Sequence, residues 1–414
     1  MKSCKLTALA LLASSSMLVA DTKPAATAIN NLGVDLYRKL AGGDANLCLS
    51  PYSIQVALAM TFAGADGQTR TEMAKALHYP EEGAAIHDSF AALKYFLDAA
   101  IAKSVERSKE LKCDPITFNV ANRLFGQKGV DFLSSFLELT KNLYGAPLEQ
   151  VDFKTNADQA MATINGWVED QTHKRIKNLI PPGALNATTR LVLVNAIYMK
   201  APWADPFPAG GTKPDGFHVR GADTVTDVPM MSRRAKLGYL KDDGFTAVTI
   251  PYSTGDLQFL VIVPDETNGL QGVEAKLTGD LLANCAKASE KEVILHLPKF
   301  KLEPPTASLG RILRQLGMRS AFDEPPGTAN FDRMALRRPS DYLAISEVFH
   351  KTFISVDEKG TEAAAATAVG METLAIVQPE QPVEVKVDRP FLFAIQHRPS
   401  GACIFIGRVT DPRE

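Results

Sequence analysis

The chain lacks a dominant charge and lacks any break in composition. Its 414 residues include 45 Lys and Arg against 47 Asp and Glu, which gives a formal net charge of −2. This balance offers no electrostatic basis for binding nucleic acid, and the small basic clusters 299–301 and 337–338 predict solvated faces. No Gly/Ser-rich linker divides the sequence, and 45% of the residues are hydrophobic, enough for a large core. We therefore predict that residues 21–414 form a single domain.

Catalytic and metal-binding signatures are also missing. The sequence contains no GxSxG, HExxH, GxxxxGK[ST] or GxGxxG pattern. Its seven histidines are scattered without metal-ligand spacing. Its five cysteines form no CxxC pair; they are Cys4, Cys48, Cys113, Cys285 and Cys403. These absences predict a protein that is not an enzyme, has no metal site and no cofactor, and keeps mostly free thiols.

His350 is the histidine that stands inside an apolar, strand-like segment, 343–351. A catalytic base needs a reacting proton within hydrogen-bond reach, and the sequence identifies no nucleophile for it. We therefore interpret His350 as a hydrogen-bonded core residue rather than a catalytic one.

The N-terminal segment 1–20 has the pattern of a secretory signal peptide. Lys2 and Lys5 give a positive start, Leu6–Leu12 is an apolar core, and a small residue follows at the expected cut. A membrane anchor is the weaker alternative, because the apolar run is short and is broken by Ser14–Ser16. We predict that the mature chain is secreted or periplasmic, and no other segment approaches the length that would cross a membrane.

Periodicity divides the chain into an early helical part and a late strand-rich part. Helical spacing of apolar residues predicts helices over 25–40, 51–62, 72–77, 90–110, 157–172 and 308–316. Apolar runs predict strands over 116–125, 191–199, 247–251, 257–263, 293–300, 343–356, 383–387, 391–396 and 403–409. Ser50 fits the N-cap of the second helix, with Pro51 at its first position. This order predicts an α+β fold with mixed sheets.

The segment 357–369, DEKGTEAAAATAV, can be interpreted as a helix or as a strand. Alanine is the best helix former, so local propensity favours a helix. With a period of two, one face is uncharged and consists of Thr361, Ala363, Ala365, Thr367, Val369 and Met371. The other face, which we expect to be wet, consists of Glu362, Ala364, Ala366, Ala368, Gly370 and Glu372. A strand with one small, uncharged face could insert into the middle of a sheet, where charged side chains would be excluded. The long aperiodic stretch from here to Val383 is typical of a functional loop or of disorder.

The motif Glu358-Lys359-Gly360-Thr361-Glu362-Ala363-Ala364 resembles the hinge of inhibitory serpins. Other segments resemble this family in the family's order: 46–77, 118–125, 164–180, 191–198 with Trp203, 297–300, 389–393 and 406–409. The resemblance covers roughly residues 28–412. It implies a serpin fold with three β-sheets, about nine helices and an exposed reactive-centre loop at about 358–382.

The resemblance also implies roles for single residues. The hinge comprises Glu358, Gly360, Thr361, Ala363, Ala364, Ala365 and Ala366. Its Gly360 and Thr361 would begin an insertion into the main sheet, and its alanines would keep the inserting strand slim. The shutter, a polar cluster beneath the opening sheet, comprises Ser50, Ser53, Asn195 and His350. Trp203 would lie near the top of the sheet, in the breach where insertion starts.

The implied activity is suicide inhibition. A target serine protease, or for some members a cysteine protease, attacks the loop and forms a covalent acyl-enzyme. The cleaved loop then inserts as a new strand, and serpin loop insertion is itself a standard example of strand addition and of released strain. The native state would be metastable and held by a kinetic barrier. We expect a monomer that binds no membrane.

The scissile bond follows from the family's usual spacing after the hinge glutamate. Counting from Glu358 places it at Leu374–Ala375, with Met371 and Ile376 as alternatives. A leucine suits chymotrypsin-like, elastase-like and some subtilisin-like proteases, whose primary pockets are apolar. No Arg or Lys lies between Thr361 and Val385, which argues against a trypsin-like target.

Two other functions compete with inhibition. A non-inhibitory serpin would act as a carrier, chaperone or storage protein, and such members often have bulky or charged hinge residues. The Thr and four alanines of this hinge favour inhibition. An unrelated secreted hydrolase would need a nucleophile–base pair that the sequence does not display.

Overall fold

The computed structural model describes residues 21–80, 85–338, 341–362 and 381–414. The α-helices of this part are α1 (Lys23–Leu40), α2 (Pro51–Gly64), α3 (Gly67–Ala76), α4 (Ala85–Leu111), α5 (Ser134–Tyr144), α6 (Phe153–Gln171), α7 (Leu270–Lys276), α8 (Gly279–Cys285) and α9 (Gly310–Gln315). The strands are β1 (Leu47–Leu49), β2 (Thr117–Gln127), β3 (Glu149–Val151), β4 (Leu191–Pro202), β5 (Lys213–Phe217), β6 (Thr226–Asp242), β7 (Phe245–Pro251), β8 (Leu257–Pro264), β9 (Glu290–Pro298), β10 (Phe300–Leu302), β11 (Ala307–Ser308), β12 (Ile345–Asp357), β13 (Gly360–Thr361), β14 (Val383–Lys386), β15 (Phe391–His397) and β16 (Ala402–Val409). The predicted α+β class is confirmed.

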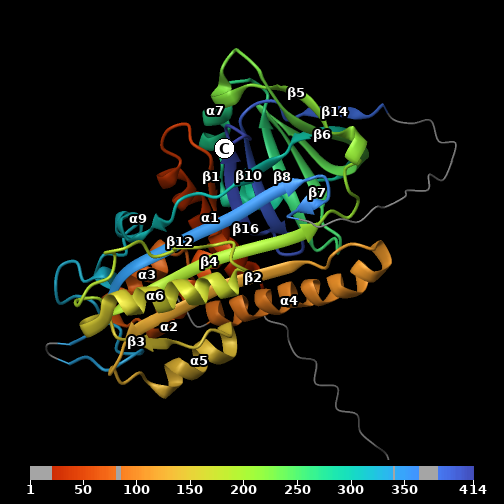
Figure 1. Ribbon diagram of the computed structural model, residues 1–414. Helices are drawn as coiled ribbons and strands as arrows, with labels where there is room; N and C mark the ends of the chain where they lie inside the picture. The colour runs from red at the N-terminus through yellow and green to blue at the C-terminus, as the bar shows by residue number, and fades with distance from the viewer. Residues whose placement is uncertain (1–20, 81–84, 339–340, 363–380) are drawn as a thin grey trace, which may run out of the picture.

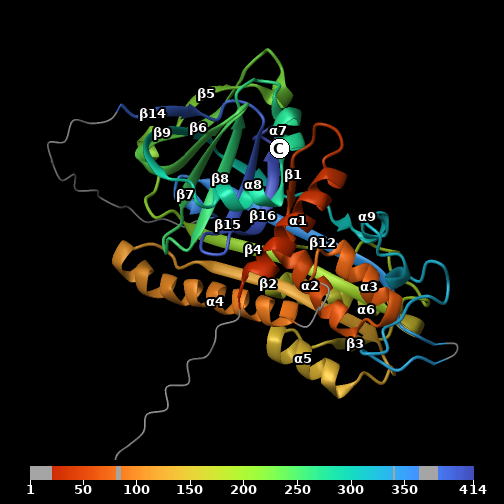
Figure 2. The same cartoon turned by 180° about the vertical axis from the view of Figure 1, so that it is seen from behind.

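A seven-stranded sheet crosses the molecule, in the order β10-β12-β13-β4-β2-β3 with β11 beside β12. Its central strands β4 and β12 are parallel neighbours, whereas β2 is antiparallel to β4. Figure 1 shows α6 lying across one face of this sheet, where Ile164 and Val168 pack over the strands. On the opposite face, seen from behind in Figure 2, α2 lies against β2 and β4. The sheet is therefore covered on both sides.

A nine-stranded sheet forms the other half, in the order β1-β16-β15-β8-β7-β6-β9-β14 with β5 beside β6. The long strand β6 belongs to two strand groups. Residues 238–242 pair with β7, whereas residues 226–238 pair with β5 and β9. Because β6 is shared, two of the three predicted sheets are joined by hydrogen bonds into one.

The predicted start of α2 is confirmed by its cap. The Ser50 hydroxyl accepts the Ser53 N–H at 3.1 Å, and Pro51 takes the first helical position, where its missing N–H leaves no bond unmade. Nearly every residue of α2 is buried, because the helix lies between the sheet and the other helices. This cap also fixes two of the residues predicted to form the shutter.

The cysteines of the described residues are free, as predicted: Cys48, Cys113, Cys285 and Cys403. Burial raises the pKa of the Cys48 and Cys285 thiols to about 12. A thiol with such a pKa holds almost no thiolate at neutral pH, so both are unreactive core residues.

Candidate functional site

The hinge begins in a tight turn that returns the chain to the sheet. The Asp357 carboxylate accepts the N–H groups of Lys359 at 2.8 Å and of Gly360 at 3.2 Å. After this turn, β13 lies between β12 and β4 and is antiparallel to both. A Cβ atom at Gly360 would lie 2.1 Å from the carbonyl oxygen of Ala201, so only glycine allows so close an approach.

Thr361 is completely buried on the side of the sheet away from α6. It pairs with Ala201 of β4 and with Val356 of β12. Its hydroxyl lies 2.6 Å from the hydroxyl of Tyr252, and neither side chain has exposed surface. A charged side chain at this position would have no solvent and no partner ion.

Trp203 contacts the hinge through its ring and its backbone. Its ring stacks on Tyr252 with centroids 4.8 Å apart, and its indole N–H donates to the Asp357 carbonyl at 3.0 Å. Its backbone N–H donates to the carbonyl of Lys359 at 2.9 Å. The predicted breach residue therefore lies directly against the turn that precedes β13.

Glu358 is held by contacts that the sequence did not predict. Its carboxylate binds the Lys299 ammonium at 2.8 and 3.1 Å and accepts the Thr212 hydroxyl at 2.8 Å. Partial burial opposes ionisation, but these donors outweigh it and lower the pKa of the Glu358 carboxyl. Lys299, in the cluster 299–301 predicted to be a solvated face, is partly exposed, but its ammonium also binds the hinge.

Glu362 corrects the expectation of a wet outer face. Its carboxylate pairs with Arg175, in the segment after α6, and only 14% of its side chain is exposed. Burial raises the pKa of this carboxyl, although Arg175 favours its ionised form. The face opposite Thr361 is therefore covered, because α6 and the segment that follows it lie over the sheet.

The shutter residues meet in one buried hydrogen-bonded cluster. His350 of β12 and Asn195 of β4 are direct register partners, and His350 Nδ1 lies in hydrogen-bond contact with Asn195 Oδ1. The Asn195 amide donates to Asn122 Oδ1 at 2.9 Å, and Ser53 donates to the same oxygen at 2.8 Å. The cluster thus crosses three neighbouring strands, β2, β4 and β12, and reaches α2.

The bonds of His350 fix its protonation state. Its Nε2 accepts the backbone N–H of Ser50 at 3.0 Å, so Nδ1 carries the proton and donates to Asn195. Burial lowers the pKa of His350 to about 3. The Ser50 hydroxyl instead donates to the Ile404 carbonyl at 2.6 Å. Ser50 and His350 are therefore not arranged as a nucleophile and its base.

Asn122 is a shutter residue that the sequence reasoning missed. With a period of two it shares a face with the apolar residues Phe118, Val120 and Leu124, and it is the register partner of Asn195. Its side chain is almost fully buried. The available signal was an asparagine on the apolar face of each of two predicted strands.

Several predicted site residues lie outside the described residues. They are Ala363, Ala364, Ala365, Ala366, Met371, Leu374, Ala375 and Ile376. Their roles stay predictions.

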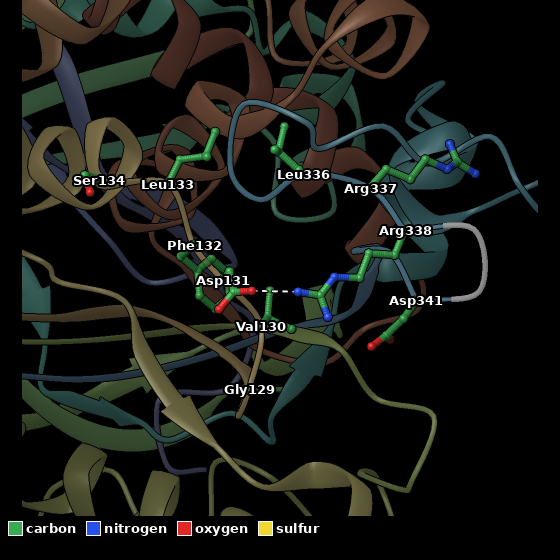
Figure 3. A pocket seen from close by; sticks show the side chains of 10 residues that line it. All are labelled: Gly129, Val130, Asp131, Phe132, Leu133, Ser134, Leu336, Arg337, Arg338 and Asp341. Carbon is green, nitrogen blue, oxygen red and sulfur yellow. Dashed lines mark hydrogen bonds and ion pairs between the residues drawn. The ribbon is translucent and has the colours of Figure 1, made fainter.

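The described surface has two hollows of similar volume. One of about 370 Å³ lies between the segment after β2 and the segment before β12; Figure 3 shows Arg338 reaching across it to Asp131, at 2.6 Å. The other, of about 390 Å³, lies beside Glu274 and Arg408. Neither is lined by a histidine or a cysteine.

Among the residues with described positions, no group of three or more His, Cys, Asp and Glu side chains could hold a metal ion. Within the same residues, none of the helices has the length and apolar character needed to cross a membrane.

Comparison with known proteins gives a consistent result. The family model described as "Serpin (serine protease inhibitor)" matches residues 27–412. An uncharacterized serpin-like protein of Thermococcus kodakarensis is 38% identical over 95% of this chain and 87% of its own length. The leukocyte elastase inhibitor of Bos taurus is 38% identical over 92% of this chain and 97% of its own. The structure of human thyroxine-binding globulin superposes with a TM-score of 0.78 at 28% identity, covering 95% and 100% of the two chains.

Proposed function

Because this chain belongs to the serpin family of serine protease inhibitors, we propose that it is a suicide-substrate inhibitor that inserts its cleaved loop into the seven-stranded sheet. The observation that carries the proposal is the position of β13. Gly360 and Thr361 already occupy the first places of a strand between β12 and β4. A strand that continued from them would be antiparallel to both neighbours, the more stable pairing.

The register of β13 supports the assignment of the two faces. Continued along β4, it places Ala363 beside Met199, Ala365 beside Ile197 and Thr367 beside Asn195. These β4 side chains face the core beneath the sheet or the shutter. Along β12 the same register places Thr367 beside His350. Insertion would therefore separate His350 from Asn195 and bring a hydroxyl between them.

The other face of the continued strand would lie under α6. Ala364 falls beside Tyr198 and Ala366 beside Ala196, in the layer where Ile164 and Val168 pack on the sheet. Interiors are close-packed, so a larger side chain there would have to displace the helix. Small residues are therefore needed on both faces for different reasons. One face would meet the buried core on the side away from α6, and the other would lie under α6.

The covalent chemistry follows from the loop's place as a protease substrate. The protease serine attacks the carbonyl carbon of Leu374, and the Leu374–Ala375 amide breaks as the amine of Ala375 leaves with a proton from the protease histidine. The ester to Leu374 remains. Until then β14, paired with β9, holds the far end of the loop. Cleavage removes this tether and frees the N-terminal part to insert.

The energy of insertion comes mainly from backbone pairing. A strand of roughly a dozen residues that gains about one net hydrogen bond per residue releases on the order of 10 kcal/mol. This is comparable with the whole stability of an ordinary domain. The cleaved, inserted chain should therefore be far more stable than the native chain, which explains how insertion could deform a bound protease.

The target and the location are part of the proposal. Leu374 suits a chymotrypsin-like or elastase-like primary pocket, and the Bos taurus relative is named for elastase inhibition. The segment 1–20 supports secretion. The fold alone does not decide between inhibition and ligand carriage, because thyroxine-binding globulin shares it; the small, uncharged hinge favours inhibition.

The test is a denaturing gel after brief incubation of the mature chain with chymotrypsin or elastase. We expect a band near the summed masses, and mass spectrometry of the released C-terminal peptide should begin it at Ala375. Thr361→Arg should be cleaved without forming that band, because the charge cannot enter the sheet. Gln381→Arg adds the same charge beyond the inserting strand and should trap normally. Clean cleavage of the native chain by both proteases, with both remaining active, would refute inhibition of this class.

A further inference from the structure

We use the term slot for the line between the paired strands β4 and β12 along which an inserting strand would enter. The end of this slot farthest from Thr361 has a distinct structure. Their parallel pairing runs from Phe353–Tyr198 down to Ile345–Leu191. Near its end, Ile345 and Glu347 pair with the consecutive residues Leu191 and Val192, so Ser346 is the extra residue of a β-bulge. A bulge ends regular pairing and re-aims a side chain, which here is the Ser346 hydroxyl.

The Ser346 hydroxyl forms a hydrogen bond across the far end of the slot. Ser346 Oγ accepts the backbone N–H of Arg190, the residue before β4, at 3.1 Å. The Arg190 guanidinium donates to Asp341 Oδ1 at 3.1 Å. Both Ser346 and Asp341 come from the β12 side of the slot, so the two contacts join its two sides. We call these contacts the Arg190 clasp.

Further hydrogen bonds hold the residues of the clasp in place on the β4 side and on the β12 side. Arg190 also donates to the carbonyls of Ala187 and Thr189, at 2.9 and 3.1 Å, which fixes its guanidinium. On the other side, the Glu347 carboxylate accepts the N–H groups of Gly310 and Val348, at 2.7 and 2.8 Å. These bonds tie the bulge to α9. The clasp therefore connects two held segments rather than two free surface side chains.

We propose that the Arg190 clasp limits the rate at which loop insertion is completed. A strand that starts at Thr361 separates β4 from β12 progressively and meets the clasp last. In the continued register Met371 lies beside Leu191, so a strand inserted as far as Leu374 must open the clasp, whereas a partly inserted strand leaves it closed. This inference rests on the proposed function, and it assigns a control element within that function.

The same sheet offers a matched comparison that does not cross the slot. Arg123 of β2 pairs with Glu149 of β3, with side chains 22% and 38% exposed, against 22% and 43% for Arg190 and Asp341. The two ion pairs are alike in type and solvation. They differ in two respects. Only the Arg190 pair must separate when a strand enters between β4 and β12, and Arg123 also stacks on the Trp167 ring, 4.4 Å from its centroid, so rates and not fluorescence amplitudes are compared.

The experiment compares Asp341→Asn combined with Ser346→Ala against Glu149→Gln. In each chain the loop is cleaved by a protease, and insertion is followed by the fluorescence of the two tryptophans and by the rise in melting temperature. We expect insertion to be roughly tenfold faster in the clasp variant, equivalent to about 1.4 kcal/mol of barrier. Glu149→Gln should match the native rate. Equal rates in all three chains would overturn the proposal.

Failure of the proposed function gives a different result. If the native chain traps no protease, inhibition is refuted, yet the insertion rate of the cleaved chain still tests the clasp. If the cleaved native chain does not insert, insertion in the clasp variant alone would support the proposal, and no insertion in either would overturn it. Melting temperatures of the uncleaved variants establish that each has folded.

Discussion

Acidification should weaken the pairing of β4 with β12, because it favours protonation of His350. The folded chain holds this imidazole neutral, because Nε2 accepts the Ser50 N–H and Nδ1 donates to Asn195. A proton on Nε2 would remove the acceptor of a buried N–H and place a charge where no carboxylate is bonded to it. Burial accordingly lowers the pKa of His350 to about 3.

The sign and size of the effect follow from linkage. The unfolded chain binds a proton at this histidine below about pH 6.5, whereas the folded chain does so only near pH 3. The stabilising contribution of neutral His350 is therefore complete above pH 6.5 and is lost as the pH falls toward 3. At about pH 5 the loss is about 2 kcal/mol. His87 and His397, whose pKa values burial lowers to about 4, add losses in the same range.

Variants separate the three histidines. His350→Gln cannot titrate, so its free energy of unfolding should fall by about 2 kcal/mol less than that of the native chain between about pH 7.5 and pH 5. His397→Gln should show a similar reduction. The second assay is uptake of a synthetic peptide with the sequence of residues 361–374. Acid should accelerate uptake by the native chain and by His397→Gln, but not by His350→Gln. Equal acceleration in all three chains would refute the conclusion that protonation of His350 weakens the pairing of β4 with β12.

Three further changes have definite expected outcomes. Leu374→Arg should redirect trapping from chymotrypsin to trypsin, and an unchanged preference on the same gel assay would move the scissile bond elsewhere. Glu358→Gln should lower the free energy of unfolding in urea by up to about 1 kcal/mol, because its partner Lys299 is partly exposed; a larger loss would mean that the pair does more than hold the turn. Gly360→Ala should expel β13, because the new Cβ would meet the Ala201 carbonyl, and proteolysis of the hinge should become faster; an unchanged rate would contradict the close approach.

The sequence predicted the buried elements well and the half-exposed ones poorly. The runs that became β4, β15 and β16 are mostly apolar because both of their faces are covered. By contrast β6, the longest strand of the described residues, was not predicted. Its outward residues are charged and its burial alternates irregularly, because one strand serves two groups with different exposed faces.

The sequence likewise predicted some features of the site and missed others. The residue types of the shutter were recognised through the family resemblance, but register alone makes Asn195 and His350 partners, at a separation of 155 residues. Periodicity correctly separated Thr361 from Glu362. It could not reveal that a helix from elsewhere in the chain covers the second face, and no local pattern tied Lys299 to Glu358.

The pairing of β4 with β12 also constrains how the chain can fold. The turn at Asp357–Gly360 joins β12 to β13 with almost no loop to close, whereas the parallel pairing joins residues more than a hundred positions apart. Contacts that are local in sequence form sooner than distant ones, and antiparallel pairing is the more stable. A hairpin that extends β13 should therefore compete with the native sheet from the first moments of folding. If the loop inserts as proposed above, the order in which β14 and β12 find their partners would decide whether a newly folded chain keeps its loop free or has already inserted it.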